Sequence, residues 1–327
     1  MKRVLVTGGA GYIGSHACKA LLRAGIEPVC FDSLDRGHRE AVKWGPLVTA
    51  DLRDGAALDQ AFATYRPEAV LHFAALTYVG ESVGDPIRYY DNNVGGSLGL
   101  IAAMRRAGVD RLVFSSTCAV YGTPDRLPIT EDMALNPISP YGHSKRMVEQ
   151  AIVDAAQAHG LRYAILRYFN ACGLDPDGEL GEDHDPETHL VPRALMAAAG
   201  TLAHLELFGD DYPTPDGTCI RDYIHVSDLA DAHVAALRYT GGASAALCAN
   251  LGTGRGHSVR EVLDTVARVT GRKVPVTLAP RRAGDPAALY ADPSLARREL
   301  GFAPRHSDLD SIVRTAWPHF RRKETQA

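Results

Sequence analysis

The sequence predicts an α/β protein with a doubly wound parallel sheet and a smaller C-terminal α/β lobe. Three observations predict this fold. Short apolar runs alternate with stretches of helical spacing through the first 170 residues, a glycine-rich turn joins the first run to the first helix, and residues 171–190 are rich in Gly, Asp, Glu and Pro. Alternating strands and helices indicate a parallel sheet covered on both faces. The change in composition after Asn170 indicates a loop that wraps a ligand or links two lobes.

The individual elements follow from the spacing of apolar residues. We predict strands at residues 3–7, 27–32, 47–50, 69–74, 111–115 and 161–168. We predict helices at residues 13–23, 55–65, 85–107, 140–159, 227–239 and 259–270. Gly25 and Gly108 follow two of these helices at the position where glycine ends a helix. The charged tail at 321–327 is expected to be frayed.

Size and charge narrow the possible classes of protein. At roughly 150 residues per domain, 327 residues correspond to two domains or one large one. Lys and Arg number 35 against 39 Asp and Glu, the opposite balance to that of proteins that bind nucleic acid by charge. The six cysteines are scattered without a Cys-x-x-Cys pair, which predicts free thiols. The N-terminus lacks the apolar run of a signal peptide and no apolar stretch is of membrane-spanning length, so we expect a cytoplasmic protein that does not bind membranes.

The glycine-rich turn at residues 8–14 predicts a dinucleotide site. Gly8, Gly11 and Gly14 stand between the first strand and the first helix. Glycine permits a tight turn and lets backbone N–H groups approach a pyrophosphate, while the helix N-terminus adds partial positive charge. Asp32 ends the second strand 18 residues after Gly14, where a carboxylate accepts hydrogen bonds from a ribose diol and repels a 2′-phosphate. The pattern predicts a Rossmann-like domain that favours NAD over NADP, although Arg36 lies close enough to weaken that preference.

A second pattern predicts acid–base chemistry. Tyr141 and Lys145 are four residues apart near a predicted helix start, so they share one helical face. An adjacent ammonium and a positive nicotinamide favour the phenolate, which brings the pKa of the tyrosine from ~10 toward neutral. Such a base can remove a proton from a sugar hydroxyl while hydride leaves the same carbon. The run from Ser115 to Thr117 follows the fifth strand, at the carboxyl edge where ligands bind in such folds.

Together with further runs, these residues resemble the extended short-chain dehydrogenase/reductase family, and within it the UDP-glucose 4-epimerases. The similarity covers nearly the whole chain. The further runs are His72-Phe73-Ala74-Ala75, Val79-Gly80-Glu81-Ser82, Tyr90-Asp91-Asn92-Asn93, Leu166-Arg167-Tyr168-Phe169-Asn170, residues 216–226 and Arg281-Arg282-Ala283-Gly284-Asp285.

The resemblance implies an NAD-dependent isomerase that interconverts UDP-galactose and UDP-glucose through a transient 4-keto sugar. It implies that Tyr141 takes the proton of the 4-hydroxyl, that Lys145 tunes Tyr141 and holds the nicotinamide ribose, and that Thr117 relays the proton where many members have serine. The predicted cofactor residues are Gly8, Gly11, Tyr12, Ile13, Gly14, Asp32, Ser33, Asp51, Leu52, Phe73, Ala74, Ala75, Asn92, Ser115, Tyr141, Lys145, Tyr168 and Phe169. The predicted substrate residues are Thr117, Tyr141, Asn170, His189, Leu190, Phe208, Arg221, Tyr223, Arg282 and Asp285, of which the two arginines can neutralise a diphosphate.

The resemblance also implies a division of the chain. We predict an NAD-binding domain over residues 1–170, completed by segments that return near 223–252, and a UDP-sugar-binding lobe over 171–327. It further implies a homodimer through the helices predicted at 85–107 and 140–159.

Departures from the family pattern bear on the substrate. Thr77 stands where many members have lysine, His189 where many have asparagine, and Leu289 near a position whose size helps decide whether an N-acetyl group fits. The acceptance of UDP-N-acetylhexosamines, or of UDP-xylose and UDP-arabinose, therefore stays open. A 4,6-dehydratase or decarboxylase is a weaker alternative, because Cys118 and Ala119 follow Thr117 where dehydratases carry Asp-Glu. A non-catalytic NAD-sensing protein is also weaker, because such proteins tend to lose the tyrosine.

One acidic segment resembles a metal site. Residues 182–189 combine two histidines with several carboxylates, which could bind a divalent ion. We expect instead a solvated part of the substrate loop, with no metal.

Overall fold

Seven parallel strands form the main sheet of this computed structural model, which describes residues 1–282 and 285–324. Their order is β11-β6-β5-β4-β1-β2-β3. The strands are β1 (Arg3–Thr7), β2 (Glu27–Asp32), β3 (Leu47–Thr49), β4 (Val70–His72), β5 (Arg111–Thr117), β6 (Arg162–Tyr168) and β11 (Ala246–Leu251). β1 pairs with β2 on one side and β4 on the other, so the winding reverses there. The predicted Rossmann-like doubly wound sheet is confirmed, and ligands bind at such a reversal point.

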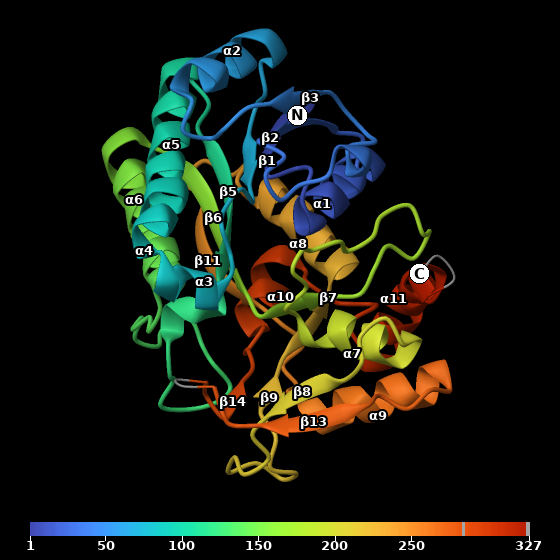
Figure 1. Cartoon of the computed structure of the whole chain (residues 1–327). Helices are drawn as coiled ribbons and strands as arrows, with labels where there is room; N and C mark the ends of the chain where they lie inside the picture. Colours follow the sequence, from blue (N-terminus) through green and yellow to red (C-terminus); the bar gives the residue numbers. More distant parts are fainter. Residues whose placement is uncertain (283–284, 325–327) are drawn as a thin grey trace.

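Helices cover both faces of this sheet (Figure 1). On one side lie α1 (Tyr12–Arg23), α8 (Val226–Tyr239) and α10 (Ser294–Leu300), and on the other α2 (Gly55–Tyr65), α5 (Gly96–Ala107) and α6 (Pro140–His159). Two buried cores result. Leu21 packs with Val6 in the first, and Leu100 packs with Leu5 in the second. Successive residues of β1 thus face opposite layers, as expected for a strand buried on both faces.

The second lobe is built from short strands and three longer helices. Its elements are β7 (Asn170–Cys172), α7 (Leu190–Ala199), β8 (Leu205–Phe208), β9 (Ile220–Arg221), β10 (Tyr223–His225), β12 (His257–Ser258), α9 (Val259–Thr270), β13 (Val276–Ala279), β14 (Ala288–Leu289) and α11 (Leu309–Glu324). Leu195, Val266 and Ile312 bring the three helices into one core. Two segments from this half of the chain belong to the first layer system instead: α8 packs against the main sheet, and β11 pairs with β6 at its edge. The domain boundary at residue 170 stays a prediction.

Some predicted elements need correction. The helix predicted over 85–107 consists of α4 (Pro86–Tyr89), a wider π-helical turn η2 (Tyr90–Gly95) and α5. The buried Asn93 explains the wider turn: its amide bonds both backbone groups of Leu76 and the hydroxyl of Ser144. β5 runs to Thr117 and so contains the hydroxyl run that was expected to follow it. The expectation of a frayed tail from residue 321 is wrong as far as Glu324, because α11 continues to that residue.

Three short elements complete the fold. They are η1 (Arg39–Ala41), α3 (Val79–Gly84) and η3 (Cys118–Tyr121). Ala283 and Gly284 of the family run, and tail residues 325–327, lie outside the described residues. None of the helices that the structure describes has the length and apolar character needed to cross a bilayer.

Candidate active site

A cleft of about 420 Å³ opens where β1, β2, β4, β5 and β6 end. It is lined by every predicted cofactor residue except Lys145, namely Gly8, Gly11, Tyr12, Ile13, Gly14, Asp32, Ser33, Asp51, Leu52, Phe73, Ala74, Ala75, Asn92, Ser115, Tyr141, Tyr168 and Phe169. The predicted substrate residues Thr117, Asn170 and His189 line it as well. The carboxyl ends of parallel strands meet at one sheet edge, so these distant segments converge there.

The glycine-rich turn passes very close to its neighbours. Gly8 has a φ of +72°, which favours glycine. A Cβ on Gly14 would lie 2.1 Å from the carbonyl oxygen of Gly8. Helix α1 begins just after Gly11, and no side chain caps its first turn in this described segment. The glycines therefore allow the turn to pack closely, and the uncapped amide groups at the start of α1 can receive an anionic group such as a pyrophosphate.

Asp32 fixes the turn from the end of β2. Its carboxylate accepts hydrogen bonds from the amides of Ala10 and Leu34, both at 2.9 Å. Burial raises the pKa of Asp32, and the two amides offset part of that effect. A carboxylate has about four acceptor positions, so capacity remains for a ribose diol.

The predicted catalytic pair lies at the N-terminal end of α6. Ser139 caps this helix by accepting from the amide of Gly142, and Pro140 occupies its first turn. Tyr141 lines the cleft, whereas the ammonium of Lys145 donates to the carbonyl oxygen of Ser115 at 2.9 Å. Lys145 therefore lies behind the cleft wall and links α6 to β5.

In the chain alone, burial dominates the pKa of both residues of this pair. Burial raises the pKa of Tyr141 well above its usual value, Tyr168 adds to the rise, and a hydrogen bond with Thr117 offsets only part of it. Burial lowers the pKa of Lys145 to about 7, against the opposing charge of Glu149. Both groups are buried in the same low-dielectric region, so each favours its neutral form. The spacing of four residues predicted the shared face but not the burial of both groups.

A buried polar network behind the cleft was missed by the sequence reasoning. Glu149 on α6 accepts from the hydroxyl of Ser116 at 2.6 Å and from two guanidinium nitrogens of Arg167 at 2.9 and 2.7 Å. Arg167 also donates to Tyr121, which donates to Asn250 on β11. Glu149 lies one helical turn after Lys145, and that spacing was the available signal.

Several cleft residues were also missed. Leu76, Tyr78 and Ala119 line the cleft; the first two directly adjoin matched residues, and Ala119 lies two residues after Thr117. Adjacency to a matched run could have found them.

Most of the predicted substrate residues lie beyond the cleft, in the second lobe. Arg221 forms an ion pair with Asp285, and the guanidinium of Arg282 lies 3.9 Å from the ring centre of Phe208. Tyr223 is buried on β10, and Leu190 begins α7. Asn170, which lines the cleft, donates to the carbonyl oxygen of Asp222, the residue after Arg221, so the two groups of residues adjoin.

The loop between β7 and α7 spans residues 173–189 and closes one side of the cleft. Its backbone carbonyls at Asp183, Asp185 and Pro186 accept hydrogen bonds from His38, Arg36 and Tyr78, respectively. These donors belong to the loops that follow β2 and β4. We name this set of three hydrogen bonds the clasp.

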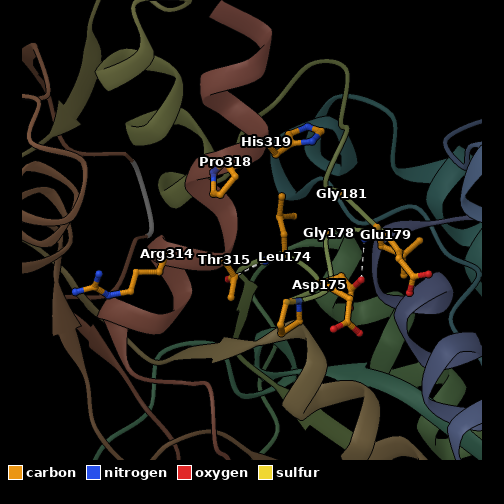
Figure 2. A pocket seen from close by; sticks show the side chains of 12 residues that line it. Leu174, Asp175, Gly178, Glu179, Gly181, Arg314, Thr315, Pro318 and His319 are labelled. Atoms are coloured by element: carbon orange, nitrogen blue, oxygen red, sulfur yellow. Dashed lines mark hydrogen bonds between the residues drawn. The ribbon is translucent and has the colours of Figure 1, made fainter.

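A second cavity, of about 650 Å³, lies between the same loop and α11 (Figure 2). Asp175, Asp177 and Glu179 lie along it, and all three carboxylates contact the ammonium of Lys19 at 2.6–2.8 Å. Lys19 thus already provides the cation for this acidic group. The cavity contains none of the predicted site residues.

Comparison with known proteins agrees with this geometry. The model of the NAD dependent epimerase/dehydratase family matches residues 4–247. The UDP-glucose 4-epimerase of Rhizobium leguminosarum bv. trifolii is 52% identical over 316 residues, 96% of each chain. A solved UDP-glucose 4-epimerase of Brucella ovis in complex with NAD is 58% identical, with a TM-score of 0.96 over 98% of this chain and 99% of that one. That of Stenotrophomonas maltophila, with bound NAD and formylated UDP-arabinopyranose, is 44% identical with a TM-score of 0.96 over all of both chains.

Identity at this level over nearly the full length goes well beyond a shared fold. The chain belongs to the NAD-dependent epimerase/dehydratase family, among the UDP-glucose 4-epimerases.

Proposed function

We propose that this isomerase interconverts UDP-galactose and UDP-glucose through a 4-keto sugar, with Tyr141 as the acid–base residue. The observation that carries the residue assignment is the position of Tyr141 in the wall of the cleft, one helical turn from Lys145. A phenol in this place can take the proton of a sugar hydroxyl and return it.

The residues of the cleft fit NAD. Gly8, Gly11 and Gly14 line the cleft at the uncapped start of α1, whose amide groups suit a pyrophosphate, and Asp32 has acceptor capacity for the adenosine ribose. Lys145 and Tyr141 would hold the nicotinamide ribose. When bound, NAD supplies a hydride acceptor for C4 of the sugar and, in its oxidised form, a positive charge that favours the phenolate.

The chain's own part of the reaction is proton transfer and positioning. Tyr141 removes the proton of the 4-hydroxyl as C4 is oxidised, and returns it after the keto sugar has presented its other face. Thr117 relays this proton through its hydroxyl. Ser115 and Tyr168 share a 2.6 Å hydrogen bond that fixes the wall on which the nicotinamide would lie.

The second lobe supplies the UDP site in this proposal. Arg221 is held in place by Asp285, and Arg282 is stacked on Phe208, so both cations are oriented before a diphosphate binds. Asn170, Tyr223, His189 and Leu190 complete the site.

Acceptance of other UDP-sugars is the second candidate. Leu289 on β14 pairs with Arg221 on β9, which places the size-determining position beside the proposed diphosphate site. The S. maltophila structure contains a formylated UDP-pentose, so UDP-arabinose is a reasonable second substrate for this chain. A dehydratase is disfavoured because Cys118 and Ala119 follow Thr117, and burial raises the pKa of the Cys118 thiol to about 12, too high for an efficient acid.

The test is conversion of UDP-galactose by purified protein without added reductant, followed by chromatography. UDP-N-acetylgalactosamine and UDP-arabinose run in parallel. A mixture of UDP-glucose and UDP-galactose is the expected result. Conversion of the pentose or the N-acetyl sugar alone would move the assignment to a related epimerase, and no conversion of any sugar would contradict the proposal.

We also propose a homodimer in a reducing cytoplasm. Large apolar side chains are exposed on α3, α4 and α6, including Val83 at 65%, Ile87 at 73% and Met147 at 49%. All six cysteines are free thiols. Light scattering should give twice the chain mass, and Ile87→Lys should shift the protein toward monomer. A monomeric mass for the unmodified chain would contradict the dimer.

A further inference from the structure

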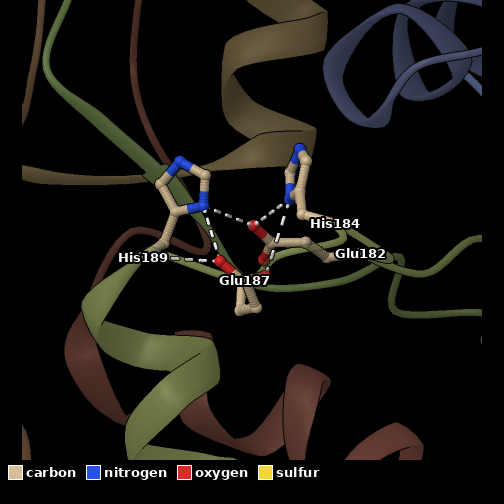
Figure 3. Close-up of side chains that lie close together, drawn as sticks. All are labelled: Glu182, His184, Glu187 and His189. Atoms are coloured by element: carbon tan, nitrogen blue, oxygen red, sulfur yellow. Dashed lines mark hydrogen bonds and ion pairs between the residues drawn. The ribbon is translucent and has the colours of Figure 1, made fainter. Parts of the chain in front are cut away.

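Four side chains of the loop at residues 173–189 converge on one point. Glu182, His184, Glu187 and His189 each offer one oxygen or ring nitrogen, and these atoms all lie within 4.8 Å of one another (Figure 3). They form two identical Glu-x-His pairs, 182/184 and 187/189. The repeat brings a carboxylate and an imidazole from each pair to the same place, within the segment that the sequence marked as a possible metal site but that we expected to hold no metal.

Four Glu–His separations in this cluster are close to the ligand–ligand distance of a small coordination tetrahedron, with a different oxygen of Glu187 facing each histidine. Nδ1 of His184 lies 3.2 Å from Oε1 of Glu182 and 3.6 Å from Oε2 of Glu187. Nδ1 of His189 lies 3.4 Å from Oε1 of Glu182 and 2.8 Å from Oε1 of Glu187. Ligands about 2.0–2.1 Å from a tetrahedral Zn²⁺ are separated by roughly 3.4 Å. The four groups therefore need only small adjustments to share one ion.

Two atoms of the cluster lack a hydrogen-bond partner although they are buried. The side chain of Glu182 is only 2% exposed, yet its Oε1 accepts no hydrogen bond among the described residues, and Nδ1 of His184 is likewise without one. Their separation of 3.2 Å would suit a hydrogen bond, so the ring nitrogen is not aimed at the oxygen. A buried carboxylate oxygen without a partner is costly, and a cation at the common point would satisfy it.

The contrast with the neighbouring acidic group sharpens this point. Asp175, Asp177 and Glu179 enclose the ammonium of Lys19, a cation supplied by the chain. The ion pairs that the described structure gives Glu182 and Glu187 are all with His184 and His189. Among the described residues, neither glutamate forms an ion pair with a Lys or Arg side chain, so a divalent ion would supply the cation that Lys19 supplies next door.

We propose that Glu182, His184, Glu187 and His189 bind one divalent transition-metal ion, with Zn²⁺ the best match. Imidazole nitrogen with carboxylate oxygen in a four-ligand set suits Zn²⁺ and disfavours Mg²⁺ or Ca²⁺, which prefer more oxygen ligands. All four positions are protein ligands, so the site is structural. His189 is 44% exposed and gives the ion a path from solvent.

The consequence of such an ion concerns the clasp. Asp183, Asp185 and Pro186 accept the three clasp hydrogen bonds, and all three lie between the first and last ligand in the sequence. A bound ion would therefore hold the whole segment 182–189 in the shape that reaches Arg36, His38 and Tyr78. We expect the ion to slow the release of NAD from the cleft without taking part in proton or hydride transfer.

The test measures metal binding directly on the full chain. Protein treated with a chelator is dialysed and titrated with Zn²⁺ in competition with a chromophoric chelator, and Co²⁺ is added separately to record the visible absorption typical of four-coordinate sites. The expected result is one equivalent of tightly bound ion. Glu182→Gln should weaken binding by more than the ~10–100-fold that loss of an outer-shell partner costs.

The matched control is Asp185→Asn, which removes one carboxylate from the same loop but none from the cluster. It should bind Zn²⁺ like the unmodified chain. If Glu182→Gln unfolds, as far-UV circular dichroism would show, the more exposed Glu187→Gln takes its place. No stoichiometric binding by the unmodified chain, or equal binding by the cluster variants, would overturn the proposal. These readouts are independent of sugar turnover, so they fail or succeed separately from the proposed function.

Discussion

The phenol of Tyr141 is buried in the cleft wall, where its surroundings disfavour the charged form. Replacing Tyr141 with Phe keeps the ring and its packing but removes the hydroxyl that acts as acid and base in our proposal. Turnover of UDP-galactose should fall by at least the ~10²–10⁴-fold typical of acid–base catalysis. Chromatography measures turnover, and a thermal melt checks that the fold is intact.

A control for this variant is Tyr163→Phe on β6, away from the cleft. It should keep full turnover. Substantial turnover by Tyr141→Phe would show that another group is the base.

The sequence predicted the active-site residues that lie within short motifs. Gly14, Asp32 and Tyr141 were identified because spacing to a strand or helix end fixes their place. The contacts of Glu149, and that of Glu182 with His189, were not predicted, because they depend on the path of the backbone through space. The pKa directions of Tyr141 and Lys145 were missed for a related reason: burial depends on the packed whole.

At the scale of an element, the turn from β1 to α1 makes a sharp steric prediction. A Cβ at Gly14 would lie 2.1 Å from the carbonyl oxygen of Gly8, so Gly14→Ala must move the turn. NAD affinity should fall by at least ~100-fold, about 2.7 kcal/mol. Equilibrium titration of protein freed of NAD measures it.

Gly55→Ala is the matched control for that substitution. Gly55 begins α2, and a Cβ there meets nothing within 4 Å. NAD affinity should be unchanged in this variant. Equal affinities for both variants would show that the turn tolerates a side chain.

Helix α6 depends on its buried ion pair. Glu149→Ala leaves the guanidinium of Arg167 buried without its partner, so the free energy of unfolding should fall by about 3–5 kcal/mol. Urea unfolding measures this. The exposed pair of Asp59 with Arg106 is the control, and Asp59→Ala should cost no more than about 1 kcal/mol. A comparable loss in both variants would contradict a special role for the buried pair.

Whole elements were predictable where the apolar period was regular. The strand at 27–32 and the helices at 55–65, 140–159 and 259–270 have the bounds that the sequence predicts. The π-helical turn at Tyr90–Gly95 was missed because it goes with contacts to distant parts of the chain: Asn93 within the turn reaches Leu76 and Ser144.

For the whole molecule, buried histidines predict sensitivity to acid. Burial lowers the pKa of His72 to about 3 and that of His233 to about 4. The folded protein keeps both neutral, whereas the unfolded chain binds protons on them below pH ~6.5. Stability is therefore fully present above that pH and is lost as the pH falls toward 4, by up to about 1.4 kcal/mol per pH unit for each histidine.

Urea unfolding between pH 7.5 and 5 measures this slope. His233→Gln should make the slope shallower by about one histidine, while the exposed His143→Gln on α6 should leave it unchanged. An unchanged slope in His233→Gln would contradict the assignment.

The architecture of the sheet was predictable, but the joining of the lobes was not. Alternating strands and helices fix a doubly wound sheet, whereas the placement of Arg221 and Asp285 beside the cleft depends on short strands with little pattern of their own. Substrate choice depends on that placement, which is why the sequence left the sugar open.

The clasp has a consequence for how this chain can change over time. Arg36, His38 and Tyr78 bond to carbonyl oxygens, which every amino acid carries. The side chain at Asp185 can therefore be exchanged without breaking its clasp contact. In this loop the backbone carbonyl groups close the cleft, whereas exposed side chains face the solvent. Substitutions at such an exposed position can therefore accumulate during evolution without loss of the contacts that retain the cofactor.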